Sequence, residues 1–118
     1  MVVDIRTGSP SFGTWEAGRL DDATHRCVYL SEELGHGFMV LEDNSTVVYP
    51  CSRGYAPRCD YGINSFDPTL AIAWPEDLAP RLSDKDATAP TLEEGERQGL
   101  LPSFEDCTAY RRNLVSSA

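Results

Sequence analysis

The stretch from residue 35 to residue 51 constrains the fold of this chain most. Two apolar runs, at 37–41 and 46–50, flank the polar cluster Glu42-Asp43-Asn44-Ser45. Turn-forming residues between β-prone runs are typical of a β-hairpin. Because side chains alternate along a strand, a four-residue loop places His36 and Tyr49 on one face as diagonal neighbours, roughly 7–8 Å apart. The stretch therefore predicts two antiparallel strands that present an imidazole and a phenol together.

Two interpretations of that pair stay open on the pattern alone. A histidine and a tyrosine on the apolar face of a hairpin are often ordinary core residues. They can equally be catalytic groups that project from one face. The loop length decides whether they meet at all, since a slip of one residue moves one of them to the opposite face.

Shorter extended runs recur on both sides of the hairpin, at 2–6, 12–20, 26–30, 61–63 and 70–74. Short strands separated by turns rich in Gly, Pro and Asp indicate an antiparallel sandwich or barrel, so residues 1–75 are expected to form the β portion of the domain.

The pattern changes after Trp74-Pro75. Ser83-Asp84-Lys85-Asp86 predicts a short helical turn, and Ser103-Phe104-Glu105-Asp106 fits a capping box that starts a closing amphipathic helix. Residues 76–118 are therefore expected to be a helical extension of the same domain.

Composition narrows the classes of partner. The 118 residues are enough for one domain, and 19 acidic residues against 10 Lys and Arg give a net charge of −9. That charge argues against nucleic acid and anionic membranes as partners, because both require a basic surface. No apolar run has the length of a membrane span, and the first residues do not resemble a signal peptide, so a cytoplasmic protein is expected.

The cysteines and histidines do not form a metal-binding pattern. His36 stands alone and His25 precedes the preceding extended run, so no H-x-H pair exists. The sequence also lacks C-x-x-C, which argues against a zinc knuckle or a thioredoxin-type pair. We therefore expect no metal and reduced, mostly buried thiols at Cys27, Cys51, Cys59 and Cys107.

Specific motifs follow one another along the chain. They are Gly8-Ser9-Pro10-Ser11-Phe12-Gly13-Thr14-Trp15, Gly35-His36-Gly37-Phe38, Val47-Val48-Tyr49-Pro50-Cys51, Asp67-Pro68-Thr69-Leu70-Ala71-Ile72-Ala73-Trp74-Pro75 and Leu82-Ser83-Asp84-Lys85-Asp86. In combination they resemble the dTDP-4-dehydrorhamnose 3,5-epimerase family, in particular actinobacterial members that make deoxysugars. The resemblance covers essentially the whole chain. It implies an all-β fold, a cupin-like jelly roll of which this chain holds the C-terminal portion without the first half, followed by C-terminal helices.

The resemblance also implies a reaction and its residues. The substrate would be a dTDP-4-keto-6-deoxyhexose, epimerised without a cofactor by removal of a proton next to the 4-keto group and its return to the opposite face. Tyr49 falls on the proton donor, a role that suits a phenol with an ordinary pKa near 10. Asp86 falls on the carboxylate that orients the catalytic histidine. The positions that contact substrate are His36, Asp60 and Lys85.

The family's proton-abstracting histidine belongs to an Arg-Gly-Leu-His-type motif that this sequence does not contain. Two smaller departures are Asp60, where the family usually has Glu, and Glu33, where it usually has Gly. One interpretation is the C-terminal portion of an epimerase that forms a homodimer or pairs with a complementing N-terminal half, and that is poorly active alone. The alternative is a non-catalytic jelly-roll remnant or a sugar-nucleotide-binding module.

Overall fold

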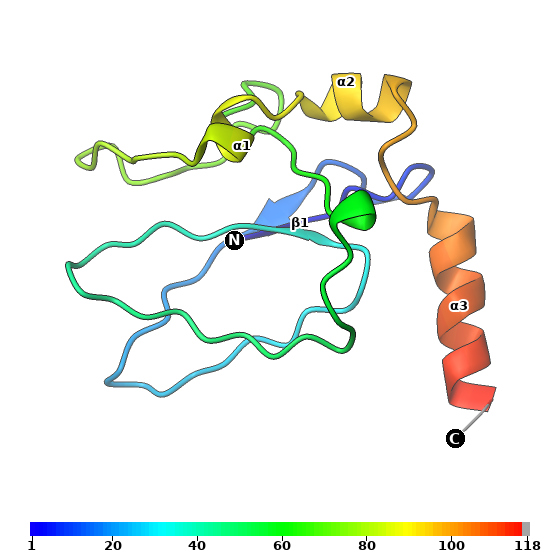
Figure 1. Cartoon of the computed structure of the whole chain (residues 1–118), viewed down its shortest axis with the longest axis horizontal. Helices are drawn as coiled ribbons and strands as arrows, with labels where there is room; N and C mark the ends of the chain where they lie inside the picture. Colours follow the sequence, from blue (N-terminus) through cyan, green and yellow to red (C-terminus); the bar gives the residue numbers. More distant parts are fainter. Residues whose placement is uncertain (117–118) are drawn as a thin grey trace.

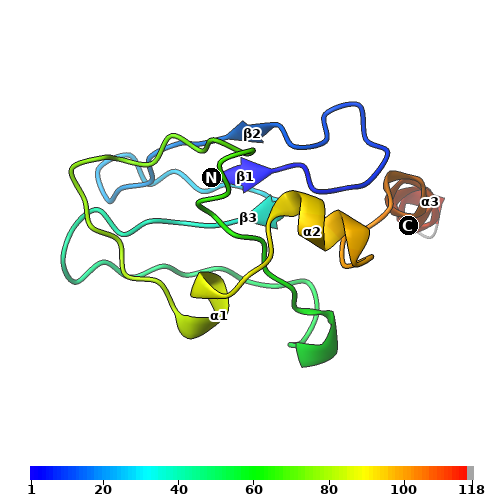
Figure 2. The ribbon, with the colours of Figure 1, turned by 90° about the horizontal axis from the view of Figure 1, so that it is seen from above.

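The computed structural model describes residues 1–116, and a small antiparallel sheet lies at its centre. The strands are β1 (Val2–Val3), β2 (Trp15–Glu16) and β3 (Gly35–His36), in the order β2-β1-β3. Val2 of the central strand lies opposite Glu16 on one side and His36 on the other. Figure 2 shows the three strands side by side, with α2 next to the ends of β1 and β3 in that view.

A small apolar core joins this sheet to the second half of the chain. Val3, Leu70 and Leu92 are buried, and partly buried side chains pack around them: Met1, Ile5, Phe12, Trp15, Ile63, Ile72 and Leu101. The indole N–H of Trp15 donates to the Leu70 carbonyl at 2.9 Å, which satisfies a polar group at the edge of the core. The core therefore holds segment 63–72 and α2 (Leu92–Arg97) against the sheet.

The helices lie mostly late in the chain. A 3-10 turn, η1 (Pro57–Cys59), precedes α1 (Asp84–Ala87), α2 and α3 (Phe104–Ser116). The two predicted caps are confirmed, because the hydroxyls of Ser83 and Ser103 accept from the backbone N–H groups three residues later. The sequence patterns above do not predict α2, although Thr91 and Glu94 form a reciprocal capping box at its start.

The predicted hairpin is found only in part. Its turn is present: Asn44 has φ +61°, and the Ser45 hydroxyl donates to the Glu42 carbonyl at 2.7 Å. Its ladder is absent, since β3 ends at His36 and no backbone–backbone hydrogen bond reaches residues 38–55 within the described part of the chain. The two arms run outward and back as extended segments without a neighbouring strand (Figure 1).

Other predicted strands are missing for the same physical reason. The runs at 26–30, 61–63 and 70–74 contain no assigned strand. A strand exists only where a neighbour pairs with its backbone groups, and the described residues supply such a neighbour only around β1. A jelly roll formed by two sheets therefore stays a prediction.

The cysteine prediction is half right. All four thiols are free, but Cys27, Cys51 and Cys59 are exposed and only Cys107 is buried. The expectation of mostly buried thiols is wrong because the three exposed cysteines lie on the segments that no neighbouring strand covers.

Candidate functional site

Lys85 and Asp60 are the predicted site residues that the structure brings into direct contact. Asp60 follows η1 and Lys85 lies in α1, and the Lys85 ammonium is 2.7 Å from the Asp60 carboxylate. The two side chains are 52% and 43% exposed, so water reaches the pair and reduces its contribution to stability. An exposed cation held next to a carboxylate is available to an anionic ligand.

Each member of this pair shifts the titration of the other. The hydrogen bond from Lys85 lowers the pKa of the Asp60 carboxyl against a smaller desolvation effect, and a hydrogen bond with Tyr55 lowers it slightly further. The same contact with Asp60 raises the pKa of Lys85. Both groups are therefore charged at neutral pH. Sequence reasoning did not select Tyr55, and its place five residues before Asp60 is the only signal that could have pointed to it.

Asp86 stabilises the first turn of α1 in this structure. Its carboxylate accepts from the Ser83 hydroxyl at 2.6 Å, while its backbone N–H donates to the same hydroxyl at 3.1 Å. Negative charge in the first turn also interacts favourably with the helix dipole. The local structure thus gives Asp86 a capping function, next in sequence to Lys85.

His36 and Tyr49 both face solvent. His36 is exposed on β3, and Tyr49 is 65% exposed on the returning arm of the 42–45 turn. Within residues 1–116, neither side chain takes part in a hydrogen bond or an ion pair. Their predicted proximity stays a prediction, and both remain open to a ligand or to another part of a protein.

Two hollows lie elsewhere on the surface. An apolar one of about 340 Å³ is lined chiefly by Phe66, Ile72, Trp74, Pro75 and Leu78. A more polar one of about 260 Å³ includes the side chains of Asp4, Arg6, Ser11, Thr14 and Trp15. Neither is lined by the five predicted site residues.

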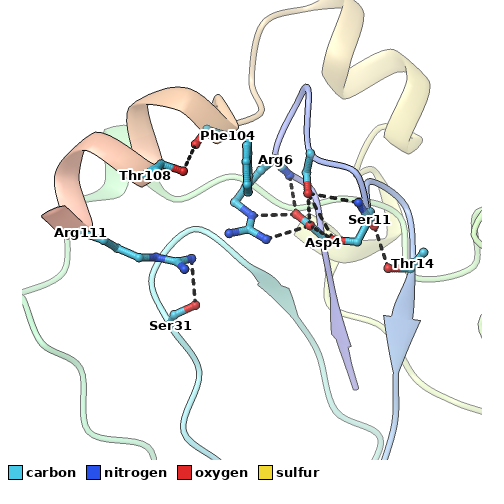
Figure 3. Close-up of polar contacts among 9 residues, drawn as sticks. Asp4, Arg6, Ser11, Thr14, Ser31, Phe104, Thr108 and Arg111 are labelled. Carbon is cyan, nitrogen blue, oxygen red and sulfur yellow. Dashed lines mark hydrogen bonds and ion pairs between the residues drawn. The ribbon is translucent and has the colours of Figure 1, made fainter.

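The second hollow borders a buried polar cluster that the sequence analysis did not single out. The Asp4 carboxylate accepts from Arg6 Nε and Nη2, both at 2.8 Å, and from the hydroxyls of Ser9 at 2.6 Å and Ser11 at 2.7 Å (Figure 3). These bonds, that of Arg6 above all, hold the pKa of Asp4 well below its usual range despite burial. The Asp-x-Arg and Ser-x-Ser spacings were the available signals. All acceptor positions are occupied by the protein itself, which indicates a structural function.

Two general features of the described chain bear on its chemistry. No set of three or more His, Cys, Asp or Glu side chains in residues 1–116 is placed to hold a metal ion. None of the helices within that range has the length and apolar character that crossing a bilayer requires.

Comparison with known proteins identifies the family. Residues 1–94 match the family model described as dTDP-4-dehydrorhamnose 3,5-epimerase. The chain belongs to this family. A dTDP-4-dehydrorhamnose 3,5-epimerase from Streptomyces griseus is 54% identical over 114 residues, which are 97% of this chain and 56% of that protein. The resemblance inferred from the motifs is therefore confirmed.

Crystal structures of family members share the fold of this chain. ChmJ, a 3'-monoepimerase from Streptomyces bikiniensis in complex with dTDP-quinovose, superposes with a TM-score of 0.93 at 47% identity, over 95% of this chain and 57% of ChmJ. The rmlC epimerase of Mycobacterium tuberculosis gives a TM-score of 0.88 at 50% identity, over 92% and 56% of the two chains. The extended segments thus follow the path of an epimerase fold, and the chain spans about half the length of these relatives.

Proposed function

We propose that this chain is part of an epimerase that acts on a dTDP-4-keto-6-deoxyhexose. It is the part that holds the proton donor and binds the substrate. The observation that carries the proposal is the family match over residues 1–94, a region that includes all five predicted site residues. Relatives of similar identity are named both as 3,5-epimerase and as 3'-monoepimerase. The proposal therefore concerns the reaction class, proton removal and return next to a ketone, and leaves the epimerised carbon open.

Chemistry assigns separate tasks to the residues. After a base removes the proton next to the 4-keto group, Tyr49 donates its phenolic proton to the carbanion from the opposite face, as a general acid. His36 contacts the sugar from β3. The Lys85 ammonium attracts the anionic part of the substrate, and Asp60 keeps that ammonium charged and restrains its position. No cofactor enters the proposed reaction.

The base belongs to a part of the enzyme outside this sequence. The sequence lacks the Arg-Gly-Leu-His-type motif that carries the family's base, and its two histidines, His25 and His36, are both exposed. Asp86 would orient the base once that base is present, and would then share its carboxylate with the Ser83 hydroxyl that it binds here. We propose that a complementing N-terminal half supplies the base and completes the site in the cytoplasm, where the completed enzyme forms a homodimer.

A second function, a non-catalytic sugar-nucleotide-binding module, is favoured by one observation. The ion pair of Lys85 and Asp60 and the open side chains of His36 and Tyr49 form in the absence of any base. Such an arrangement would still bind an anionic sugar nucleotide. Binding without turnover in every mixture would support this function over the first.

The test is complementation. The chain is mixed with the portion of the Streptomyces griseus relative that it does not cover, and epimerisation of dTDP-4-keto-6-deoxyglucose is followed by NMR. The proposal expects turnover in the mixture that falls at least 100-fold with Tyr49→Phe, the typical scale of a lost general acid. A matched control, Tyr29→Phe, changes another exposed tyrosine and should leave the rate unchanged. Turnover that is insensitive to Tyr49→Phe would refute the role of this residue.

A further inference from the structure

Helix α3 lies along one end of the molecule, beside the bends at 31–34 and 52–56 (Figure 1). Its start is fixed to the segment that follows β1. The Phe104 N–H donates to the Thr7 carbonyl at 2.9 Å, and the Thr7 N–H donates to the Pro102 carbonyl at 2.8 Å. The Arg6 guanidinium also lies over the Phe104 ring, 5.0 Å from its centroid. The first turn of α3 is thus a firm anchor.

Further along the helix, α3 contacts the segment that leads into β3. Arg111 Nη2 donates to the Ser31 hydroxyl at 3.3 Å (Figure 3). One turn earlier, Cys107 is buried against Glu33. Burial, and next the Glu33 carboxylate, raise the pKa of the Cys107 thiol to about 11. Glu33 itself has φ +79°, so the bend is held in a backbone conformation that non-glycine residues rarely adopt. His36 follows this bend by three residues.

The same face of α3 contacts the segment that carries Tyr49. Arg53 Nη2 donates to the Tyr110 hydroxyl at 3.0 Å, and the Arg53 guanidinium lies 5.8 Å from the centroid of the Tyr110 ring. The Ser52 hydroxyl also donates to the Glu32 carboxylate at 3.4 Å, which links the two bends directly. Arg53 therefore makes both a hydrogen bond and a cation–π contact with α3.

These side-chain contacts matter because the backbone of the segment that carries Tyr49 makes no hydrogen bonds with other backbone groups in the described chain. Residues 38–55 form no backbone–backbone hydrogen bond with the rest of the described chain. Only three residues separate Tyr49 from Arg53, and one of them is Pro50, whose ring fixes φ. Restraint of Arg53 therefore also restrains Tyr49, because the stretch between them is short and partly rigid.

We propose that α3 is a positioning latch, in which Tyr110 holds Arg53 and Arg111 holds Ser31, so that the segments bearing Tyr49 and His36 keep a fixed spacing. The catalytic consequence rests on the proposed function, whereas the mechanical tie does not. Tyr110 and Arg53 are positioning residues, since they would act on the reaction only through Tyr49.

Backbone ¹⁵N relaxation tests the tie without any substrate, since it reports the mobility of a segment whose amides make no backbone hydrogen bond within the described residues. Tyr110→Leu and Arg53→Gln are each expected to lower the order parameters at residues 46–55 into the flexible range, below about 0.6. The order parameters at 91–101 should stay unchanged. Combining both substitutions should add no more than either alone, because each removes the same interaction. Tyr110→Phe, which keeps the ring, and Arg53→Lys, which keeps the charge, should restore part of the rigidity.

The matched control is Arg112→Gln, which removes the same charge from an exposed position of α3. It should leave the order parameters at 46–55 as in the parent chain. Equal order parameters in the parent, Tyr110→Leu and Arg53→Gln chains would overturn the latch. Additive effects in the double variant would overturn it too, since they would show that the two side chains act separately.

A second experiment measures kcat and KM of the complemented enzyme. Tyr110→Leu is expected to lower kcat about three- to tenfold and to leave KM within twofold, because the latch positions the proton donor and does not bind the nucleotide. A rise in KM with constant kcat would contradict the catalytic consequence. If the complemented parent enzyme shows no turnover, the proposed function fails, and the relaxation experiment alone decides the latch.

Discussion

At the scale of single residues, Asp4 is a buried carboxylate that collects hydrogen-bond donors within one turn. Arg6, Ser9 and Ser11 donate to its oxygens, and its backbone pairs with Gly13 and Thr14. A buried ion pair of this kind contributes most visibly when one partner is removed, since the other is left charged without compensation. The cluster fixes the 6–14 turn between β1 and β2.

Asp4→Asn should therefore destabilise the chain by roughly 3–5 kcal/mol at pH 7, measured by urea unfolding. Because the folded state lowers the pKa of Asp4, its contribution is fully present above the unfolded pKa of about 4 and disappears as the pH falls below that value. The parent chain should thus lose stability below pH 4 more steeply than the variant. The control Asp22→Asn, at an exposed position, should change neither quantity. Parallel acid curves for the parent and Asp4→Asn would contradict this assignment.

At the scale of elements, local signals were sufficient for helices and insufficient for strands. Ser83 and Ser103 predicted two helix starts correctly because a cap and its N–H partners lie within four residues. The 37–41 and 46–50 runs predicted paired strands, yet only their turn formed, because a ladder depends on neighbours that no local pattern supplies. Of the candidate site, the family resemblance selected Lys85 and Asp60, which do meet, whereas Arg53 has significance only through its contact with distant Tyr110.

The pairing of β1 with β3 requires glycine at one position. A Cβ atom added to Gly35 would lie 2.8 Å from Val3 Cγ1 and 3.1 Å from Ile5 Cγ2. Both neighbours are β-branched and rotate little, so they cannot easily move aside.

Gly35→Ala should accordingly lower the free energy of unfolding by about 1–3 kcal/mol, the usual cost of overpacking. Gly18→Ala is the matched control, because a Cβ there meets no atom within 4 Å. Thermal or urea unfolding of the two variants beside the parent decides the point. Equal stability of both variants would show that the β1–β3 contact is looser than the structure indicates.

At the scale of the whole molecule, the arms between residues 20 and 50 carry large apolar side chains into solvent. Tyr29 and Val48 are 86% and 85% exposed, and the other large members of this surface are Leu20, Val28, Phe38, Val40, Leu41, Val47 and Tyr49. Extended segments with free backbone groups and apolar side chains pair readily with further strands. The chain spans only 56% of its Streptomyces griseus relative, and the rest of that relative's length, less than half, is available to cover such a surface.

We therefore expect the chain alone to associate or to melt without a sharp transition, and to gain a cooperative transition at higher temperature when the complementary portion is added. Size-exclusion chromatography with light scattering, together with thermal scans, measures both properties. Phe38→Ser combined with Val48→Ser should reduce association, whereas Thr46→Ser on the same arm should not. A monodisperse monomer with a cooperative transition would contradict this expectation.

We propose that this chain holds the proton donor of an epimerase and not its base. The most direct measurement is solvent-deuterium incorporation at C3 and C5 of dTDP-4-keto-6-deoxyglucose, followed by NMR in D₂O. The chain alone should incorporate deuterium no faster than buffer, since removal of a carbon-bound proton needs a positioned base that contributes typically 10²–10⁴-fold. Rapid incorporation by the chain alone that disappears with Tyr49→Phe would contradict the claim and would assign the missing base to this chain, with His36 as the first candidate.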